Sequence, residues 1–424
     1  MSKHKKQATS ENMKKTGQPC ESPVPDSLNI LNDDCLAMIF QHLPIRDKLI
    51  INTVCKRWKE VSPLAWQNVK TVDFEQYADE PSTFDELPDE YRTIQWLGVI
   101  IKRSGTYLKH LKLSYSANCK LLPLVGHYCE NLTTIDISYD FQGWDWAAFF
   151  PKMQKFRLAY KEEEGESLPE KILPTLSPES LTEIRLSIFY PNDVSRQPIP
   201  GFFSPIAAKA FQRFTKLEVI CLSTFNISSE MMDALNQMHH VKSLFLPYCN
   251  LNQRLPSMSL LANLEHLNFS SVKEINDSFL IVLSDIGQNL KSLALTQCNV
   301  TDEGIGHLRK LRQLEELDIG DNWKITGALL GTLKGLRKLN CQSSSVFDEG
   351  LIELIKNAPN LENLELMFTN ITELLLMEAN EITKRRTNKL PLKMEVDVHV
   401  TDDWNECNDS PLLFVDGVTT IRLG

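Results

Sequence analysis

The 424-residue chain lacks long apolar runs and an excess of positive charge, and each absence excludes a class of function. No stretch approaches the roughly eighteen apolar residues that a membrane-spanning helix requires. Residues 1–27 are polar and lysine-bearing, without the apolar core of a signal peptide. The formal net charge of −10 argues against a nucleic-acid surface, because phosphate binding needs a basic face. We therefore expect a protein partner, no membrane and no nucleic acid, and a cytoplasmic or nuclear location.

Catalytic and cofactor motifs are also missing. The chain has no GxxxxGKS/T, GxGxxG, HExxH or GxSxG sequence. His239-His240 directly precedes an expected strand, and we interpret the pair as part of a turn. Cys407, near Asp402-Asp403, is the sole candidate for a reactive thiol, and nothing supplies an orienting base at a recognisable spacing. We expect no catalytic residue and no cofactor.

The ten cysteines do not follow the spacing of a disulfide framework or a zinc site. Most of them fall inside periodic apolar patterns, which indicates reduced, structural thiols. One loose group resembles a metal site, and its members are His110, Cys119, His127 and Cys129. Because no tight CxxC or HxxxH pair anchors this group, we expect no metal there.

The dominant feature of the sequence is a repeat. The pattern apolar-x-x-apolar-x-apolar recurs from residue 108 onward, and its copies begin at Leu108, Leu132, Met153, Leu181, Leu217, Val241, Leu264, Leu290, Leu314, Leu336 and Leu361. From Leu217 to Leu361 the steps are 24, 23, 26, 24, 22 and 25 residues, which is the period of leucine-rich repeats.

The repeat predicts the architecture of the array. Side chains alternate along a strand, so the fourth and sixth positions of each copy share one face and point inward. Apolar residues at helical spacing follow each strand, as in Ile305, Leu308 and Leu311. One repeat cannot bury its apolar face alone, so the copies stack. We predict an α/β leucine-rich-repeat solenoid with a curved parallel sheet inside and helices outside, preceded by a small all-α domain.

The ninth position of several copies carries a small polar side chain that can bond backbone groups at the turn leaving the strand. These residues are Cys249, Cys298, Asn322 and Thr369. Thr301-Asp302 and Asn276-Asp277 are placed to cap the helices that follow. The stretches that begin at two of these positions, Cys298-Asn-Val-Thr-Asp302 and Asn322-Trp-Lys-Ile-Thr326, resemble the cysteine-containing leucine-rich repeats typical of F-box proteins.

A short helical module precedes the array. Leu36, Ile39, Phe40 and Leu43 have helical spacing, and Pro44 stops the helix. Asp33 or Asp34 is placed to cap this helix, and Asp47 to cap a second one. About forty residues are too few for a self-sufficient core, so we expect apolar surface that a partner covers. We expect two residues of the module, Phe40 and Ile50, to pack internally.

The module resembles an F-box in the series Leu31, Leu36, Ile39-Phe40, Leu43, Asp47, Leu49, Val54-Cys55-Lys56, Trp58 and Trp66, although Leu31-Asn32 replaces the family's Leu-Pro. The resemblance implies binding to a Skp-type adaptor, which links to a cullin and to a RING subunit that carries a ubiquitin-conjugating enzyme. Carried over by position, the adaptor-binding residues are Leu31, Leu36, Ile39, Leu43, Leu49, Val54, Cys55, Lys56, Trp58 and Trp66.

The fifth position of each copy, with the seventh and eighth, is expected to face the concave side, where early copies are more basic and later ones more acidic. Aromatic residues and arginines dominate the energetics of interfaces. The candidate substrate-binding residues are Tyr139, Arg157, Tyr160, Arg185, Phe245 and Tyr248.

The expected organisation is a disordered polar tail at 1–25, an F-box at 26–68, a linker or first irregular repeat at 69–107, leucine-rich repeats at 108–380, and capping strands with a tail at 381–424. The C-terminal segment either closes the last repeat or folds over the concave side.

The resemblance favours a substrate receptor for ubiquitination and proteasomal degradation. The alternatives are a ligase-independent repeat scaffold and an enzyme that depends on Cys407.

Overall fold

The computed structural model describes residues 30–75, 82–113, 118–139, 150–160, 168–188, 201–401 and 409–418. Its contacts divide the chain into two compact units, with the boundary between Asn68 and Val69. The tail at 1–25 that we expect to be disordered lies outside the described residues. None of the described helices is both long enough and apolar enough to cross a membrane.

The first unit is helical, with elements α1 (Asp33–Gln41), α2 (Ile45–Ile50), η2 (Ile51–Thr53), α3 (Lys56–Val61) and η3 (Ser62–Trp66). The cap of α1 is Asn32, whose side chain accepts a 2.8 Å hydrogen bond from the Cys35 amide, rather than Asp33 or Asp34. Pro44 stands before α2, which has no side-chain cap, so Asp47 lies in the first turn instead of capping it. The carboxylates still lie at helix N-termini, where negative charge is favourable.

The core of this unit is built on Phe40, which is buried and meets Trp58 edge to face with ring centroids 4.9 Å apart. Its predicted internal packing is confirmed. The same prediction for Ile50 is wrong, because 43% of this residue is exposed while its neighbour Leu49 is buried. Adjacent positions on a helix point 100° apart, so only one of the two faces inward.

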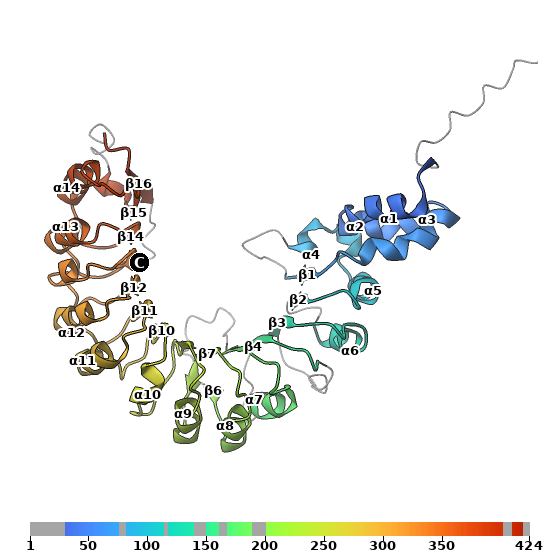
Figure 1. Cartoon of the computed structure of the whole chain (residues 1–424), viewed down its shortest axis with the longest axis horizontal. Coiled ribbons are helices and arrows are strands. Elements are labelled where there is room, and N and C mark those ends of the chain that lie inside the picture. The colour runs from blue at the N-terminus through green and yellow to red at the C-terminus, as the bar shows by residue number, and fades with distance from the viewer. Residues whose placement is uncertain are drawn as a thin grey trace, which may run out of the picture. The chain divides into compact units, whose positions relative to one another are not determined.

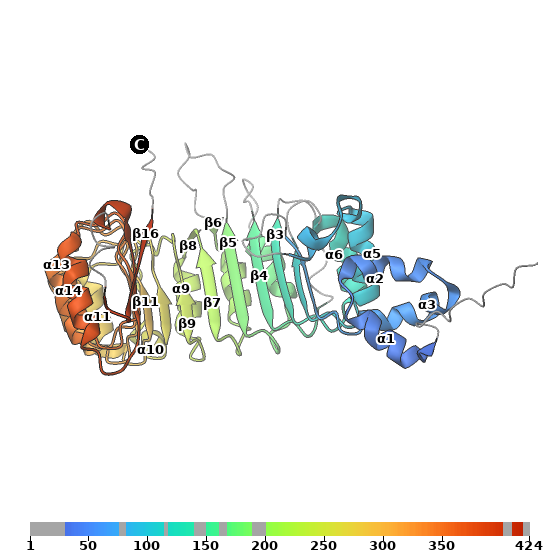
Figure 2. The same cartoon turned by 90° about the horizontal axis from the view of Figure 1, so that it is seen from above.

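The second unit is built on one long parallel sheet, in which fourteen strands are found in the described part of the chain. They lie in sequence order along the inner side of the unit (Figures 1 and 2). The strands are β1 (Thr71–Phe74), β2 (His110–Leu113), β3 (Thr134–Tyr139), β4 (Lys155–Tyr160), β5 (Glu183–Ile188), β7 (Val219–Ser223), β9 (Ser243–Phe245), β10 (His266–Asn268), β11 (Ser292–Ala294), β12 (Glu316–Asp318), β13 (Lys338–Asn340), β14 (Asn363–Glu365), β15 (Leu392–Asp397) and β16 (Leu413–Val418).

The two ends of the sheet extend beyond the clear copies of the repeat. β1 pairs in parallel with β2, so the segment before residue 108 contributes a strand of its own to the array. β15 and β16 continue the sheet after β14 in the same direction. The strands at 392–397 and 413–418 therefore extend the array rather than crossing its inner face. A further two-stranded sheet joins β6 (Gly201–Phe202) to β8 (Phe225–Asn226).

Helices from α5 onward lie on the outer side of the sheet (Figure 1). The α-helices of the second unit are α4 (Thr83–Glu86), α5 (Ile94–Ser104), α6 (Asn118–Tyr128), α7 (Leu168–Ile172), α8 (Pro205–Phe211), α9 (Ser229–Asn236), α10 (Met258–Leu261), α11 (Asp277–Ile286), α12 (Asp302–His307), α13 (Asp348–Asn357) and α14 (Glu373–Lys384). Short 3₁₀ turns are η4 (Asp89–Tyr91), η6 (Leu173–Thr175), η7 (Leu308–Lys310), η8 (Leu330–Thr332) and η9 (Val398–Val400).

The inward direction of the fourth positions is confirmed. They align across the strands, as in the neighbours Leu293, Leu317 and Leu339, and each of these three is at most 2% exposed. Sixth positions such as Leu295 are buried as well. Since each aliphatic layer is completed by the next repeat, burial is continuous along the array.

Polar side chains at the ninth position hold the turns, as predicted. The thiols of Cys249 and Cys298 donate to the carbonyls of Leu222 and Phe269, at 3.1 and 3.2 Å. The Thr369 hydroxyl donates to a carbonyl within its own repeat. The caps are confirmed too, because Thr301 accepts from the amide of Glu303 and Asn276 from that of Phe279.

The repeat pattern did not predict one feature of the backbone. The eighth positions of successive copies adopt left-handed conformations, with φ between 53° and 58° at Tyr248, Ser271, Gln297, Asp321, Ser343 and Phe368. Such a conformation is unfavourable for residues with a Cβ. Hydrogen bonds between repeats offset it, as where the Ser271 amide donates to the Thr296 carbonyl at 2.7 Å.

Candidate protein-binding surfaces

The ten predicted adaptor-binding residues fall into three groups by exposure. Ile39 and Val54 are 42% and 59% exposed, and Cys55 and Lys56 are exposed as well. Leu31, Leu43 and Trp58 are half-buried. Apolar side chains left in solvent on a small unit are typical of a surface that a partner covers. The exposed group is therefore the part of the prediction that is available to an adaptor.

Three of the ten predicted contacts are core residues instead. Leu36, Leu49 and Trp66 are buried, with exposures of 0%, 2% and 1%. The structure therefore corrects their assignment as adaptor contacts. An apolar residue in so small a module serves either its own core or a partner, and residue type does not separate the two roles.

The sequence reading also missed exposed apolar residues in this unit. Met38 on α1 is 62% exposed, Ile50 at the end of α2 is 43% exposed, and Leu64 in η3 is 37% exposed. A signal for Met38 was present, because Leu36 and Phe40, four residues apart, define the inner side of α1. Residues 38 and 39 then point away from it.

The departure at Leu31-Asn32 has a structural role. Asn32 caps α1 through its side chain, which proline in this place cannot do. Arg57 on α3 reinforces the same corner, since its guanidinium donates to the Leu31 carbonyl and, at 2.8 Å, to the Asp33 carboxylate. The start of the F-box-like module is thus held by polar contacts from two helices.

The inner face of the second unit carries the fifth positions as one continuous row. In strand order the row is Asp73, Lys112, Asp136, Arg157, Arg185, Cys221, Phe245, Asn268, Ala294, Asp318, Asn340, Glu365, Glu395 and Asp416. Paired strands lie about 4.8 Å apart, so neighbours in the row are within side-chain reach of each other.

The two arginines in the basic part of this row share one carboxylate of the same chain. Arg157 and Arg185 both donate to Oε1 of Glu183, with shortest distances of 2.9 and 2.6 Å, and Lys155 lies 3.3 Å from Oε2. The Glu183 side chain is 6% exposed. Burial raises the pKa of Glu183, but the hydrogen bond from Arg185 and the charge of Arg157 outweigh it, so the pKa lies below its ordinary value.

Sequence reasoning missed Glu183, which stands at the third position of its copy. Two of the six predicted substrate contacts are thereby engaged by a carboxylate of this chain. Arg185 also places its guanidinium 5.5 Å from the centroid of the Phe245 ring, a cation–π contact that orders both side chains. The arginines are still more than a third exposed, so a client can contact them, but their charge is shared.

The remaining candidate substrate-binding residues differ in exposure. Tyr248 is 57% exposed, and Phe245 is half-buried on the inner face. Tyr160 is buried, with 1% exposure, which corrects its assignment to the concave surface. β4 runs two residues beyond the sixth position, so alternation turns the eighth position inward. The Tyr139 side chain lies outside the described part of the structure.

The late part of the row is acidic and unpaired. Asp318, Glu365, Glu395 and Asp416 form no ion pair with any described residue. Burial, followed by the carboxylates of Glu395 and Asp318, raises the pKa of Glu365. A shallow hollow of about 280 Å³ lies over β11–β14, and its lining includes Asp318, Asn340 and Glu365.

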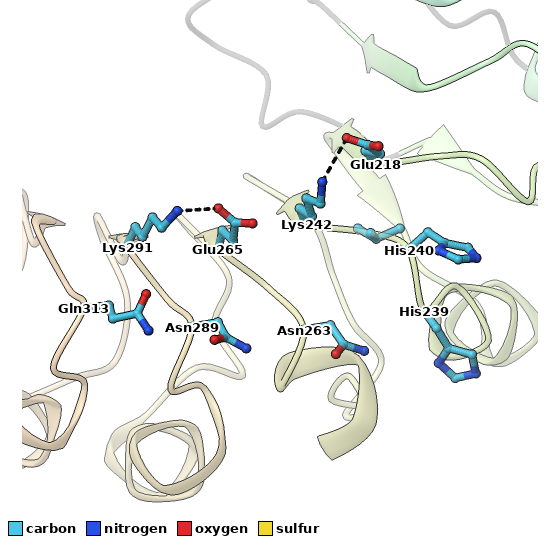
Figure 3. Close-up of a pocket in the computed structure, with 10 residues that line it drawn as sticks. Glu218, His239, His240, Lys242, Asn263, Glu265, Asn289, Lys291 and Gln313 are labelled. Atoms are coloured by element: carbon cyan, nitrogen blue, oxygen red, sulfur yellow. Dashed lines mark hydrogen bonds and ion pairs between the residues drawn. The ribbon is translucent and has the colours of Figure 1, made fainter.

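A larger polar hollow of about 530 Å³ lies where strands begin, and His239-His240 lies on its edge (Figure 3). Second positions of the repeats line it with alternating charge. Lys242 reaches Glu218 at 3.4 Å and Lys291 reaches Glu265 at 2.7 Å. Exposed pairs of this kind contribute little each, and they leave the hollow almost neutral. The arrangement indicates cohesion between repeats rather than a ligand site.

The buried thiols of the array are unsuited to nucleophilic chemistry, and the described residues offer no metal site. Burial raises the pKa of Cys129, Cys249 and Cys298 to about 12, which keeps these thiols protonated at neutral pH. Within the described ranges no three His, Cys, Asp or Glu side chains are placed to hold a metal ion. Cys407 and the side chain of Cys119 lie outside those ranges.

Replacing Glu183 by glutamine is expected to lower the free energy of unfolding at pH 7 by about 1–2 kcal/mol, below the usual value for a buried pair because solvent screens the arginines. A lowered pKa means stability that is present above the unfolded value of 4.5 and is lost as pH falls through the folded value. Urea unfolding of both proteins at several pH values should show the difference shrinking below pH 4.5. A constant difference would contradict this linkage.

Comparison with known proteins agrees with the two units. Residues 28–63 match the F-box domain. Human F-box/LRR-repeat protein 12 is 31% identical over 102 residues, which are 24% of this chain and 30% of that protein. The match thus spans less than a third of the length of this curated relative.

Two solved structures are similar to this chain at low sequence identity. A chain of the yeast Rad7 and Elc1 complex has a TM-score of 0.50 and 16% identity, and the match covers 92% of this chain and 91% of that one. An internalin from Listeria monocytogenes has a TM-score of 0.42 and 16% identity, over 76% of this chain and 83% of that one. The likeness to the chain of the yeast complex supports the fold alone.

Proposed function

Because the chain joins an F-box domain to a leucine-rich-repeat solenoid, as F-box and leucine-rich-repeat proteins do, we propose that it is the substrate-recognition subunit of a Skp–cullin–F-box ubiquitin ligase. The observation that carries the proposal is this combination in two separate compact units. One unit exposes apolar side chains for an adaptor, and the other exposes a sheet face for a client. We place this activity in the cytoplasm or nucleus.

The proposed mechanism is proximity. The F-box binds a Skp-type adaptor through exposed residues such as Ile39 and Val54, and the adaptor leads to the cullin and the RING subunit. The array binds the client, so that a client lysine remains close to the conjugating enzyme. Holding reactants together replaces a bimolecular encounter and raises the rate without a catalytic group on this chain. Ubiquitination of the client then leads to proteasomal degradation.

Affinity purification of the intact chain and of a variant lacking residues 26–68 tests the proposal. The intact chain should co-purify the adaptor, cullin and RING subunit, and the truncated chain should lose all three. The contact boundary at Asn68 leaves the sheet unit whole in this variant. Client proteins should be retained by both chains and should increase when the proteasome is inhibited. Equal recovery of the adaptor with both chains would exclude docking through the F-box.

A repeat scaffold that works without a ligase is the alternative. Its support in the sequence was the replacement of Leu-Pro by Leu31-Asn32. Since Asn32 caps α1, the replacement preserves the start of the helix. The scaffold hypothesis predicts that the intact chain recovers clients but no adaptor. The purification described above therefore distinguishes it from the ligase hypothesis.

A further inference from the structure

The two ends of the inner sheet face differ in the charge that remains after internal pairing. At the β4–β5 end, Glu183 engages both arginines of the row. At the β12–β16 end, the row carries four carboxylates, and none of them forms an ion pair with a described residue. Four carboxylates of the row that have no cation partner among the described residues therefore lie at its C-terminal end.

The strand register places the carboxylates of this end side by side. Glu365 pairs with Glu395, and Glu395 pairs with Asp416, so three acidic side chains stand on adjacent strands. Asp318 lies two strands before Glu365, with Asn340 between them. The shallow hollow of about 280 Å³ lies over β11–β14, so it adjoins Asp318 and Glu365 but not Glu395 or Asp416.

Two neighbouring lysines, Lys338 and Lys393, offset only part of this charge. Lys338 lies 2.7 Å from Glu316 and is engaged there. Lys393 is exposed on β15, two residues before Glu395 and on the same face of the strand, and forms no ion pair with a described residue. Burial, followed by the charges of Glu395 and Asp318, raises the pKa of Glu365, and the charge of Lys338 lowers it by less. A cation from a partner would relieve this repulsion.

We propose that the inner face of strands β12–β16 is the docking surface for an extended client segment that carries several arginines or lysines. The inference rests on the proposed function and names the class of substrate. Four strand steps span about 19 Å, which an extended chain covers with about six residues. The acidic side chains are spread over this length, and no described group of three converges to hold one metal ion.

A fluorescent seven-residue peptide with arginine at positions 1, 3, 5 and 7 and serine between them is a suitable probe. Its anisotropy is measured with the full-length chain. We expect saturable binding that weakens as salt is added, because the pairing is electrostatic. The same peptide with glutamine in place of arginine should bind at least about tenfold more weakly. Equal affinity for the two peptides would overturn the proposal.

Matched variants of the chain locate the surface. The double change Glu365→Gln and Glu395→Gln should weaken binding of the arginine peptide about tenfold. The control double change Glu349→Gln and Glu378→Gln alters net charge equally on helices α13 and α14 and should change binding less than about twofold. Equal weakening by both pairs would mean unspecific attraction to an acidic protein and would overturn the proposal.

Two further outcomes are informative. Saturable binding of calcium alone, lost in the Glu365→Gln and Glu395→Gln chain, would make the surface a cation site and overturn the peptide proposal. The variant lacking residues 26–68 should bind the arginine peptide as the intact chain does, since the surface lies wholly in the second unit. If the intact chain binds the peptide but recovers no adaptor, the ligase proposal fails while this one stands.

Discussion

Replacing Val54 by aspartate is expected to weaken binding of the Skp-type adaptor by at least about a hundredfold, because a charge then enters an apolar contact that excludes water. Val54 is 59% exposed and follows η2, so the change disturbs no buried packing of the module. Ile39→Asp on α1 should act in the same way, since Ile39 is 42% exposed. Calorimetric titration of each full-length variant with purified adaptor measures the effect.

Two controls separate docking from folding. Leu36→Ala opens a cavity at a fully buried site and should lose about 2–5 kcal/mol of stability, so adaptor binding and the thermal transition of the module weaken together. Ile206→Asp on α8 places the same charge at a site that is 57% exposed in the second unit, and it should leave adaptor binding unchanged. Undiminished binding by both Val54→Asp and Ile39→Asp would show that docking uses another surface.

The F-box module shows where sequence patterns stop being informative. Helical spacing predicted α1 and its apolar character, and Phe40 proved to be core. The pattern did not separate residues that pack internally from residues left for a partner. Leu49 and Ile50 were assigned the opposite way round, although they are neighbours of nearly equal hydrophobicity. A unit this small is apolar on most sides, so periodicity alone does not define its interior.

The array was more predictable because its repeat fixes the register. Strands, inward positions and turn-holding side chains follow from a period of about 24 residues. The exceptions depend on contacts between repeats. Glu183 reaches Arg157 from the neighbouring strand, 26 residues further along the chain, a pairing that becomes visible only once the strands are aligned. Tyr160 is buried because β4 is longer than the repeat pattern requires.

The eighth positions illustrate a different limit. Six successive copies place a left-handed residue there, yet the side chains have no chemistry in common and none is glycine. The conformation is imposed by hydrogen bonds between repeats, which form only when the turns stack. The residue types at these positions do not predict a left-handed conformation.

The ninth position is the side-chain counterpart of these backbone bonds, and Asn322 is its most connected member. Its amide donates to the carbonyls of Leu295, Ile319 and Gly320 at 2.9–3.0 Å, and its oxygen accepts from the amide of Cys298 at 2.9 Å. Asn322 is 2% exposed, so water does not replace these partners. One side chain therefore satisfies four backbone groups in two consecutive repeats.

Asn322→Ala is expected to lower the free energy of unfolding by about 3 kcal/mol, because several buried backbone groups lose their partner at once. Asn322→Cys is the matched control that the chain itself supplies, since Cys249 and Cys298 occupy the same position and each donates to a carbonyl of the preceding repeat. It should lose only about 1–2 kcal/mol. Urea unfolding gives both values, and hydrogen exchange at the Cys298 amide should accelerate more in the alanine variant. Equal losses would mean that the volume of the side chain, and not its hydrogen bonds, holds adjacent repeats together.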